Sequence, residues 1–328
     1  MKYDIITFGS ATNDIYLISK NFKVVSEKKL YTQKGLCLNL GSKIDVEDIL
    51  FRTGGGGINT AFTFKNQRFK VAWCGMVGKD DAGQKIIKEL KENKIGTSFI
   101  LKTSKKPTNH SVILTTPGKE RTILVFRGAA GELTKKDIPW QGLEANWFYL
   151  APLSGKLALI FEDLVNFAKK NKIKVAVNPG NSQLSLPQEL LQKILKQIDV
   201  LFLNQEEASM LTKIPYNKEN DIFKKLDEMV PGICVMTKGP EGAIASDGNF
   251  LYKAPAPEAK VVDVTGAGDS FSAGFLSGLI KKNDISFAMQ LGTANSGACI
   301  SQWGAKEGLL KKNQKWKKAE IKKEPIII

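Results

Sequence analysis

The sequence predicts an α/β protein in which helices cover both faces of a mostly parallel sheet. Beyond residue 145, short apolar runs alternate regularly with longer helical segments. Alternation of this kind implies parallel strand pairing through right-handed crossovers. The chain of 328 residues is long enough to bury an extensive core. We therefore expect a three-layer α/β/α sandwich, with strands at 147–151, 174–177, 199–203 and 233–236 and helices at 157–171, 187–197, 204–211 and 292–301.

The N-terminal region begins with the same kind of element. Residues 5–8 form a short apolar run that breaks at Gly9, and Asp14 follows this strand at its carboxyl end, where ligands gather in open α/β sheets. Residues 15–51 differ, because they do not alternate with helices. For the rest of this region we expect strands at 16–18, 23–25, 30–31, 36–40 and 71–75 and a helix at 84–93.

The composition is that of a globular protein with excess positive charge. The formal net charge is +15, but the lysines that supply it are spread along the chain, which favours attraction of phosphorylated ligands over a nucleic-acid surface. The densest basic run, 311–323, is expected to be a solvated terminal helix or a frayed end. No apolar run is long enough to span a bilayer, and the N-terminus lacks a signal-peptide layout, so we expect a cytoplasmic protein.

Cysteine and histidine are too scarce for several kinds of site. The four cysteines are scattered without the paired spacing of a zinc site, and we expect them to be reduced. His110 is the only histidine, which excludes paired-histidine metal sites, and no Gly-x-Ser-x-Gly elbow accompanies it. A hydrolase with a Ser-His-Asp triad is therefore not expected.

A small-residue turn at 262–271 is the most informative stretch. An apolar segment ends there and the apolar period of a buried helix begins, so Gly266, Ala267 and Gly268 should lie at a helix N-terminus, which favours anions. Asp269 would repel an anion unless it has a task, such as accepting a proton from a hydroxyl that attacks phosphorus. A glycine-rich turn used only for packing is the alternative.

The residues from Asp263 to Asp269 resemble the Asp-Thr-x-Gly-Ala-Gly-Asp motif of the ribokinase-like (PfkB) carbohydrate and nucleoside kinases, with Val264 in the second position. The resemblance extends in order from Gly9 to about Lys306. It implies a kinase domain at 1–310 with a small β-sheet lid, followed by a basic tail at 311–328. ATP would be the phosphoryl donor and Asp269 the general base, while the N–H groups of the glycine turn would hold the transferred charge.

The resemblance also assigns residues to the acceptor. Asp14 corresponds to an aspartate that holds two substrate hydroxyls, and a carboxylate can accept from both at once. Gly55, Gly56 and Asn59 lie in a stretch similar to the family's Gly-Gly-x-x-x-Asn motif, which contacts sugar hydroxyls and acts as the lid hinge; a flexible linker is the alternative. Arg127 could pair with an acidic or phosphorylated substrate or form a surface ion pair.

Metal sites follow from the same resemblance. Asn204 and Glu207 stand three residues apart on one helix face, where the family organises Mg²⁺, mostly through water. Relatives that need potassium bind K⁺ with backbone carbonyls near the residues equivalent to Asp263 and Thr265, which makes this a candidate site for a monovalent cation.

For ATP, the stretch 237–243 is similar to the family's nucleotide loop and fits neither the Walker nor the Gly-x-Gly-x-x-Gly pattern. Phosphate binding must therefore rest on the glycine turn. The residues expected to contact the nucleotide are Asn204, Thr237, Gly239, Gly242, Gly268 and Asn295.

The lid is expected to draw its strands from about 15–51 and 98–127. The returning strands would be 98–101, 111–116 and 122–126, with a turn at Pro117-Gly118, because proline fixes φ and glycine permits a positive value. His110 would lie on a lid strand. Lids of many relatives pair between subunits, so we expect a homodimer.

The resemblance implies an ATP-dependent kinase that phosphorylates a hydroxymethyl group of a sugar. A nucleoside kinase on the same fold is the alternative, and Phe51, Tyr16 and Phe126 are candidates to stack on a base. The sequence departs from ribose kinases at 152–154, where their glutamate is missing, and from the fructokinase pattern at 178–182. A catalytically silent sugar-binding protein and a basic nucleic-acid-binding protein are further alternatives.

Overall fold

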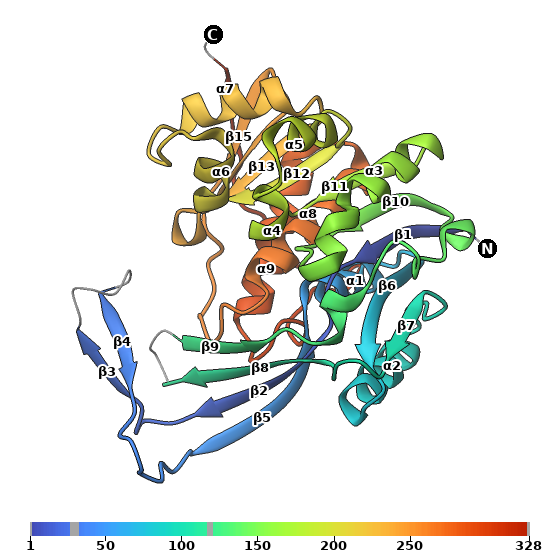
Figure 1. Ribbon diagram of the computed structural model, residues 1–328. Coiled ribbons are helices and arrows are strands. Elements are labelled where there is room, and N and C mark those ends of the chain that lie inside the picture. Colours follow the sequence, from blue (N-terminus) through green and yellow to red (C-terminus); the bar gives the residue numbers. More distant parts are fainter. Residues whose placement is uncertain (1, 27–32, 117–120, 327–328) are drawn as a thin grey trace.

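A computed structural model describes residues 2–26, 33–116 and 121–326. Figure 1 shows a large α/β body from which a smaller β-sheet unit projects. The body contains a ten-stranded sheet in the order β16-β15-β14-β13-β12-β11-β10-β1-β6-β7. Its strands are β1 (Tyr3–Phe8), β6 (Val71–Gly78), β7 (Ile100–Thr103), β10 (Ala145–Leu150), β11 (Lys174–Val177), β12 (Val200–Asn204), β13 (Ile233–Thr237), β14 (Ala243–Ser246), β15 (Phe250–Ala254) and β16 (Lys322–Pro325).

The pairing confirms the predicted sandwich. Every strand from β7 through β13 in this order is parallel to its neighbours, whereas β14, β15 and β16 add antiparallel strands at one edge. Alternate strand residues enter two separate cores: Phe148 and Leu150 lie in one, Trp147 and Tyr149 in the other. Such alternation is expected when both faces are covered.

Helices cover each face of this sheet (Figure 1). The first core contains side chains of α3 (Phe161–Lys170), α5 (Gln188–Leu195), α6 (Gln205–Thr212) and α7 (Glu219–Met229). The second core contains side chains of α1 (Gly56–Asn66), α2 (Asp81–Glu92), α8 (Ala267–Lys282) and α9 (Ile285–Ile300). The shorter helices are α4 (Asn181–Leu184), η1 (Ala129–Glu132), η2 (Trp140–Gly142), η3 (Gly155–Ile160) and η4 (Gly239–Glu241).

The lid is a four-stranded sheet in the order β5-β2-β8-β9. Its strands are β2 (Thr12–Ile18), β5 (Asp48–Gly54), β8 (Asn109–Thr115) and β9 (Arg121–Phe126), and His110 lies on β8. In this sheet the central pair β2–β8 is parallel and the outer pairs are antiparallel. A separate hairpin of β3 (Lys23–Ser26) and β4 (Lys34–Cys37) extends beyond it (Figure 1). The strand expected at 30–31 and the turn at Pro117-Gly118 lie outside the described residues.

One strand expected in the lid belongs to the central sheet. Residues 98–101 were expected to return into the lid, but Ile100–Thr103 forms β7 and pairs in parallel with β6. The reason is the connection: β6, α2 and β7 form a strand-helix-strand unit, and such a crossover returns to the same sheet. The prediction for this segment is therefore wrong.

The basic tail is not a terminal helix or a frayed end over its described part. Residues 322–325 form β16 and pair antiparallel with β15, where Nζ of Lys323 lies 3.9 Å from the centroid of the Phe250 ring. Trp316 packs against Phe287 of α9 at a centroid distance of 6.3 Å. The tail therefore contributes a strand to the central sheet.

Two further observations concern the cysteines and the helices. Cys74, Cys234 and Cys299 are buried and Cys37 is exposed, and all four are free. In the described part of the chain, no helix combines the length and apolar character that crossing a bilayer requires.

Candidate active site

The glycine turn leads into α8 as the sequence predicts. Gly266 is the N-cap residue, with a left-handed φ of 76° that favours glycine, and a Cβ there would overlap with the Cβ of Ala305. Gly268 is exposed, and no atom outside its own helix backbone lies within 4 Å of where its Cβ would be. Three backbone N–H groups, those of Gly266, Ala267 and Gly268, were predicted to donate to the transferred phosphoryl group. The N–H of Ala267 already donates to the Val264 carbonyl, at 3.2 Å. Ala305 therefore packs against the turn at Gly266, whereas the turn is exposed at Gly268.

Gly266→Ala is expected to lower both thermal stability and kcat. A side chain at this positive φ costs about 1–3 kcal/mol, and the added Cβ collides with Ala305. Gly248→Ala is the matched control, because Gly248 has a φ of 84° with open space around its Cβ position. Both variants should melt earlier, but only Gly266→Ala should lose kcat in a coupled assay of ADP release. If Gly266→Ala and Gly248→Ala have the same kcat, the glycine turn is not part of the active site.

Asp269 lies in the first turn of α8, half-buried. Its Oδ2 accepts a hydrogen bond from Nδ2 of Asn59 at 2.9 Å, and its Oδ1 faces Gly56, whose Cβ would lie 3.4 Å away. Burial raises the pKa of the Asp269 carboxyl above its usual range, although the Asn59 hydrogen bond lowers it. A carboxylate with a raised pKa beside an anion-favouring turn can act as a general base.

Two buried side-chain acceptors among the residues predicted to bind the acceptor have no hydrogen-bond partner within the described residues. They are Oδ1 of Asp14 and Oδ1 of Asn59, on side chains that are 6% and 5% exposed. Burial raises the pKa of the Asp14 carboxyl, which hydrogen bonds from Thr12 and Ser111 oppose. Any Cβ on Gly54 would collide with Oδ2 of Asp14, so glycine is needed for the carboxylate to lie there.

An adjacent cavity of about 370 Å³ lies beside the glycine turn. Its walls are mostly apolar and include Phe271, Val264 and Pro257, which suits a flat heteroaromatic ring. Among the residues predicted to bind nucleotide or anion, those that line this cavity are Thr237, Gly239, Gly242, Ala267 and Gly268.

Asn295 does not line this cavity, although the sequence predicts a nucleotide contact there. Its side chain is fully buried, and its Nδ2 donates to the Ser270 carbonyl at 2.7 Å while its Oδ1 accepts from the Leu310 N–H at 2.9 Å. These bonds tie α9 to α8 and to the following segment. Thr293 and Ser296, on another face of α9, line the cavity instead. Helical spacing from Ile300, which also lines it, could have identified them.

Comparison with known proteins assigns the family. A model of the pfkB family carbohydrate kinases matches residues 4–312. The chain belongs to this family. A ribokinase of Lactococcus lactis subsp. lactis (strain IL1403) is 30% identical over 302 residues, covering 89% of this chain and 95% of that protein. The solved ribokinase of Thermotoga maritima matches with a TM-score of 0.76 at 23% identity, over 94% of this chain and 96% of that one.

The solved nucleoside kinase of Methanocaldococcus jannaschii has the same fold, with a TM-score of 0.72 at 22% identity over 94% of this chain and 95% of that one. PfkB kinases are ATP-dependent phosphotransferases, and ribokinases have been solved with ATP and with ADP. The expectation of a ribokinase-like kinase is therefore confirmed. Whether this PfkB kinase acts on a sugar or a nucleoside is a separate question, because both kinds of relative share its fold.

Asn204 and Glu207, the residues predicted to organise Mg²⁺ in this kinase, form two hydrogen bonds with each other at the start of α6. The N–H of Asn204 donates to Oε2 of Glu207 at 2.9 Å, and the N–H of Glu207 donates to Oδ1 of Asn204 at 2.8 Å. Within the described residues, no group of three or more His, Cys, Asp or Glu could hold a metal. The pair fits a magnesium ion that keeps its waters and binds phosphate oxygens, since this ion dehydrates reluctantly.

The surroundings of Asp263 do not favour a monovalent cation. Its Oδ1 accepts from the N–H of Thr265 at 2.9 Å, and the guanidinium of Arg121 lies 4.0 Å away. The thiol of Cys299 approaches the Thr265 carbonyl oxygen at 3.7 Å. A second cation beside Arg121 would be repelled.

Arg127 is exposed just beyond β9, and it takes part in no ion pair between described residues. Pro152, in the stretch 152–154, lies beside Gly56, whose Cβ would be 3.3 Å from the proline ring and 3.4 Å from Oδ1 of Asp269. An apolar ring therefore stands near Asp269.

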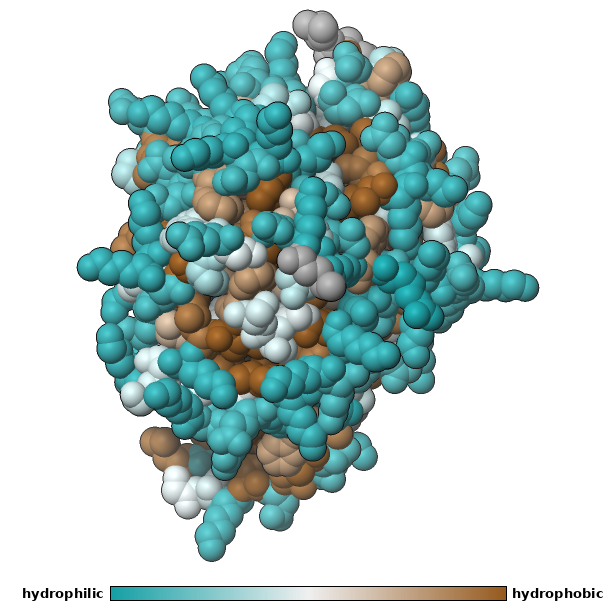
Figure 2. All heavy atoms as spheres, turned by 90° about the vertical axis from the view of Figure 1, so that its right-hand side faces the viewer, coloured by the Kyte–Doolittle hydropathy of each residue, from teal (hydrophilic) through white to brown (hydrophobic). Residues whose placement is uncertain are grey.

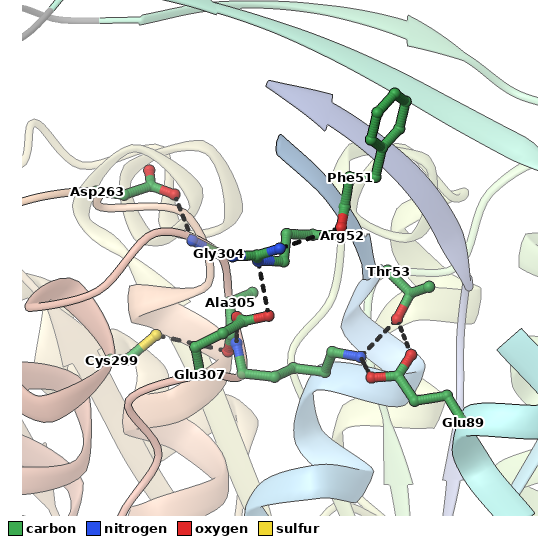
Figure 3. Close-up of polar contacts among 10 residues, drawn as sticks. Phe51, Arg52, Thr53, Glu89, Asp263, Cys299, Gly304, Ala305 and Glu307 are labelled. Atoms are coloured by element: carbon green, nitrogen blue, oxygen red, sulfur yellow. Dashed lines mark hydrogen bonds and ion pairs between the residues drawn. The ribbon is translucent and has the colours of Figure 1, made fainter. Parts of the chain in front are cut away.

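A cluster of charged and polar side chains lies between the lid and the loop after α9 (Figure 3). The sequence did not indicate this cluster. Its members are Arg52, Thr53, Glu89, Lys306 and Glu307. Lysine and glutamate are abundant in this chain, so neither type stands out in a sequence with a net charge of +15. Only the folded chain brings residues 52 and 307 together.

Proposed function

We propose that the protein transfers a phosphoryl group from ATP to a hydroxymethyl group of a sugar. The observation that supports this most is the pair of unsatisfied buried acceptors, Oδ1 of Asp14 and Oδ1 of Asn59. Leaving a buried polar group unpaired costs about 1–3 kcal/mol, so the site favours a ligand that brings several hydrogen-bond donors. A polyhydroxylated ring does so.

The proposed chemistry follows from the position of Asp269. The acceptor hydroxyl would donate its proton to Oδ1 of Asp269, because Oδ2 is held by Asn59. The hydroxyl oxygen then attacks the terminal phosphorus, and ADP leaves. The exposed backbone at Gly268 and the positive end of α8 would stabilise charge on the transferred oxygens. Mg²⁺, held through water by Asn204 and Glu207, would supply neutralising charge to the phosphates.

Strand alternation disfavours Phe51 and Phe126 as side chains that stack on a nucleoside base, and burial disfavours Tyr16. Asp14 pairs with Arg52 and Ser111, whereas Phe51 pairs with Ile15, so Phe51 faces the opposite side of the lid from Asp14. The register places Phe126 on that opposite side as well. Tyr16 is 1% exposed and packs against Trp303 at a centroid distance of 6.0 Å.

A panel assay tests the proposed function. Purified protein, ATP and Mg²⁺ are incubated with separate pentoses, hexoses and nucleosides, and ADP release is measured. The proposal expects the highest kcat/KM for a sugar. A higher value for a nucleoside would support the nucleoside kinase instead. No turnover, combined with calorimetric binding of a sugar, would indicate the catalytically silent binding protein.

We also propose that the lid pairs with the lid of a second copy. The face of the lid opposite Asp14 is apolar and open: Ile49, Phe51, Leu124 and Phe126 are 45%, 52%, 55% and 48% exposed. Figure 2 shows hydrophobic residues at the lower end of the molecule, where the lid lies, below a largely hydrophilic face. Exposed apolar patches of this kind mark interaction sites.

Phe51→Ser combined with Leu124→Ser is expected to convert a dimer into a monomer, because it removes two central apolar side chains from this face. Light scattering after size exclusion measures the mass. Leu159→Ser, at a residue that is 74% exposed on η3, is the control and should leave the mass unchanged. A monomeric unsubstituted protein would contradict the proposal.

A further inference from the structure

Lys306 and Glu307 are consecutive residues in the loop after α9, and they contact two consecutive residues at the base of the lid, Thr53 and Arg52. Figure 3 shows this region. Nε of Arg52 lies 3.1 Å from Oε1 of Glu307. Nζ of Lys306 donates to Oγ1 of Thr53 at 2.5 Å and to Oε1 of Glu89 on α2 at 2.5 Å. We call these interactions the lid–loop contact. Arg52 of the lid therefore contacts Glu307 of the loop, and the next lid residue, Thr53, contacts Lys306.

On the loop side, the lid–loop contact continues into the glycine turn. Gly304 donates its N–H to Oδ2 of Asp263 at 3.1 Å, and Oδ1 of Asp263 accepts from the hydroxyl of Thr265 at 2.7 Å. Ala305 packs directly behind Gly266. A shift of this loop would therefore move the turn that is proposed to hold the phosphate.

On the lid side, the contact continues into the acceptor residues. Thr53 directly precedes Gly54, against which the Asp14 carboxylate packs, and the next glycines lead into α1 and Asn59. Arg52 is the direct partner of Asp14 in the β2–β5 register. A shift of β5 would therefore move the side chains proposed to hold the acceptor.

The burial of Lys306 argues that its role is more than stability. Its side chain is 8% exposed, and Nζ lies 4.1 Å from the centroid of the Phe62 ring. Buried ion pairs are often no more stabilising than apolar residues of similar volume, and fixing a particular register is their best-attested use. Arg52 and Glu307 are about one-third exposed, where ion pairs contribute little to stability.

We propose that Lys306 and Glu307 are positioning residues that hold the acceptor side chains and the glycine turn at one fixed separation. The proposal rests on the proposed function, because it needs the acceptor to lie between Asp14 and Asp269. Neither residue touches the reacting atoms. Each sets the distance over which the hydroxyl must approach phosphorus, and a displacement of about 1 Å can cost roughly 100-fold in rate.

A charge swap tests the Arg52–Glu307 pair. Arg52→Glu and Glu307→Arg, each alone, should lower kcat by roughly 10- to 100-fold, because like charges then push the lid from the loop. The double variant should recover most of the loss. Hydrogen exchange of residues 263–269, measured without any acceptor, should be faster in each single variant and return toward the original rate in the double variant.

Lys306 needs a different design, since removing it alone would leave the Glu89 carboxylate without its ion-pair partner. Lys306→Met with Glu89→Gln keeps the site neutral, and Thr53→Val removes only the two hydrogen bonds of the Thr53 hydroxyl, to Lys306 and to Glu89. Both variants should lower kcat and raise the acceptor KM, with nucleotide affinity unchanged. If Lys306→Met/Glu89→Gln fails to fold, Thr53→Val and the charge swap still decide the proposal.

The matched control is the same swap in the pair Lys253–Glu324, 2.6 Å apart between β15 and β16. It should leave kcat and hydrogen exchange of the turn unchanged. Lid–loop variants that melt earlier but keep kcat and exchange would overturn the proposal, since the contact would then serve stability alone. Turnover is measured with whichever acceptor the unsubstituted protein phosphorylates, so failure of the proposed sugar specificity appears before any variant is tested.

Discussion

Asp269→Asn is expected to lower kcat by roughly 10²–10⁴-fold, the range over which general bases contribute. An amide has nearly the same shape but cannot take the proton from the acceptor hydroxyl. Nucleotide affinity should be unchanged, because the substitution leaves the apolar cavity and the glycine turn in place. Steady-state kinetics of ADP release and calorimetry with ADP measure the two quantities.

Asp221→Asn is the control, because Asp221 is an exposed carboxylate in the first turn of another helix, α7. A kcat for Asp269→Asn that matches this control would remove Asp269 from the mechanism. The pH dependence gives a second check. Burial raises the pKa of Asp269 and the base must be ionised, so kcat should fall as the pH drops through that raised pKa. Asn59→Ala removes the stabilising hydrogen bond and should move this acidic limb to higher pH.

Asp14→Asn is expected to raise the acceptor KM by roughly 100-fold. A hydrogen bond to a charged group contributes about 1.5–3 kcal/mol. In the amide only the oxygen can accept from a hydroxyl, whereas both carboxylate oxygens can. Nucleotide affinity should not change, because Asp14 does not line the apolar cavity that we expect to hold the nucleotide. Initial rates at varied acceptor concentrations measure the effect.

Asp48→Asn provides the comparison, since Asp48 lies on the same lid sheet and, among the residues that the structure describes, its carboxylate accepts only from the neighbouring Ile49 N–H, at 2.7 Å. It should leave KM unchanged. Equal KM values in Asp14→Asn and the unsubstituted protein would mean that the unpaired Oδ1 of Asp14 does not face the acceptor, and the sugar site would have to be sought elsewhere.

The layers and the glycine turn were predictable because they depend on local patterns. Buried parallel strands are continuous apolar runs, and a small-residue turn before a buried helix is recognisable over ten residues. β16 was not predictable, because its residues, Lys322–Pro325, are exposed and mostly charged. Such residues are typical of edge strands that must not pair further.

The site was only partly predictable for a related reason. The sequence singled out Asp14 because it follows an apolar run and Asn59 because it follows four glycines; in the structure Asp14 lies within β2, Asn59 lies in α1, and both side chains are buried. Asn295 was assigned to the nucleotide by resemblance to the family, yet its amide forms hydrogen bonds inside the protein. Lys306 has no sequence signal, since its importance depends on burial beside Glu89, more than two hundred residues earlier.

The central position of β1 has a consequence for folding kinetics. This strand lies between β6 and β10, so Tyr3 pairs with Ala145 across more than a hundred intervening residues. Contacts of such long sequence separation carry a large loop-closure entropy and slow the search for the native state. During synthesis, the middle of the sheet has an unpaired edge until β10 has emerged from the ribosome, and that edge is what a chaperone would need to shield.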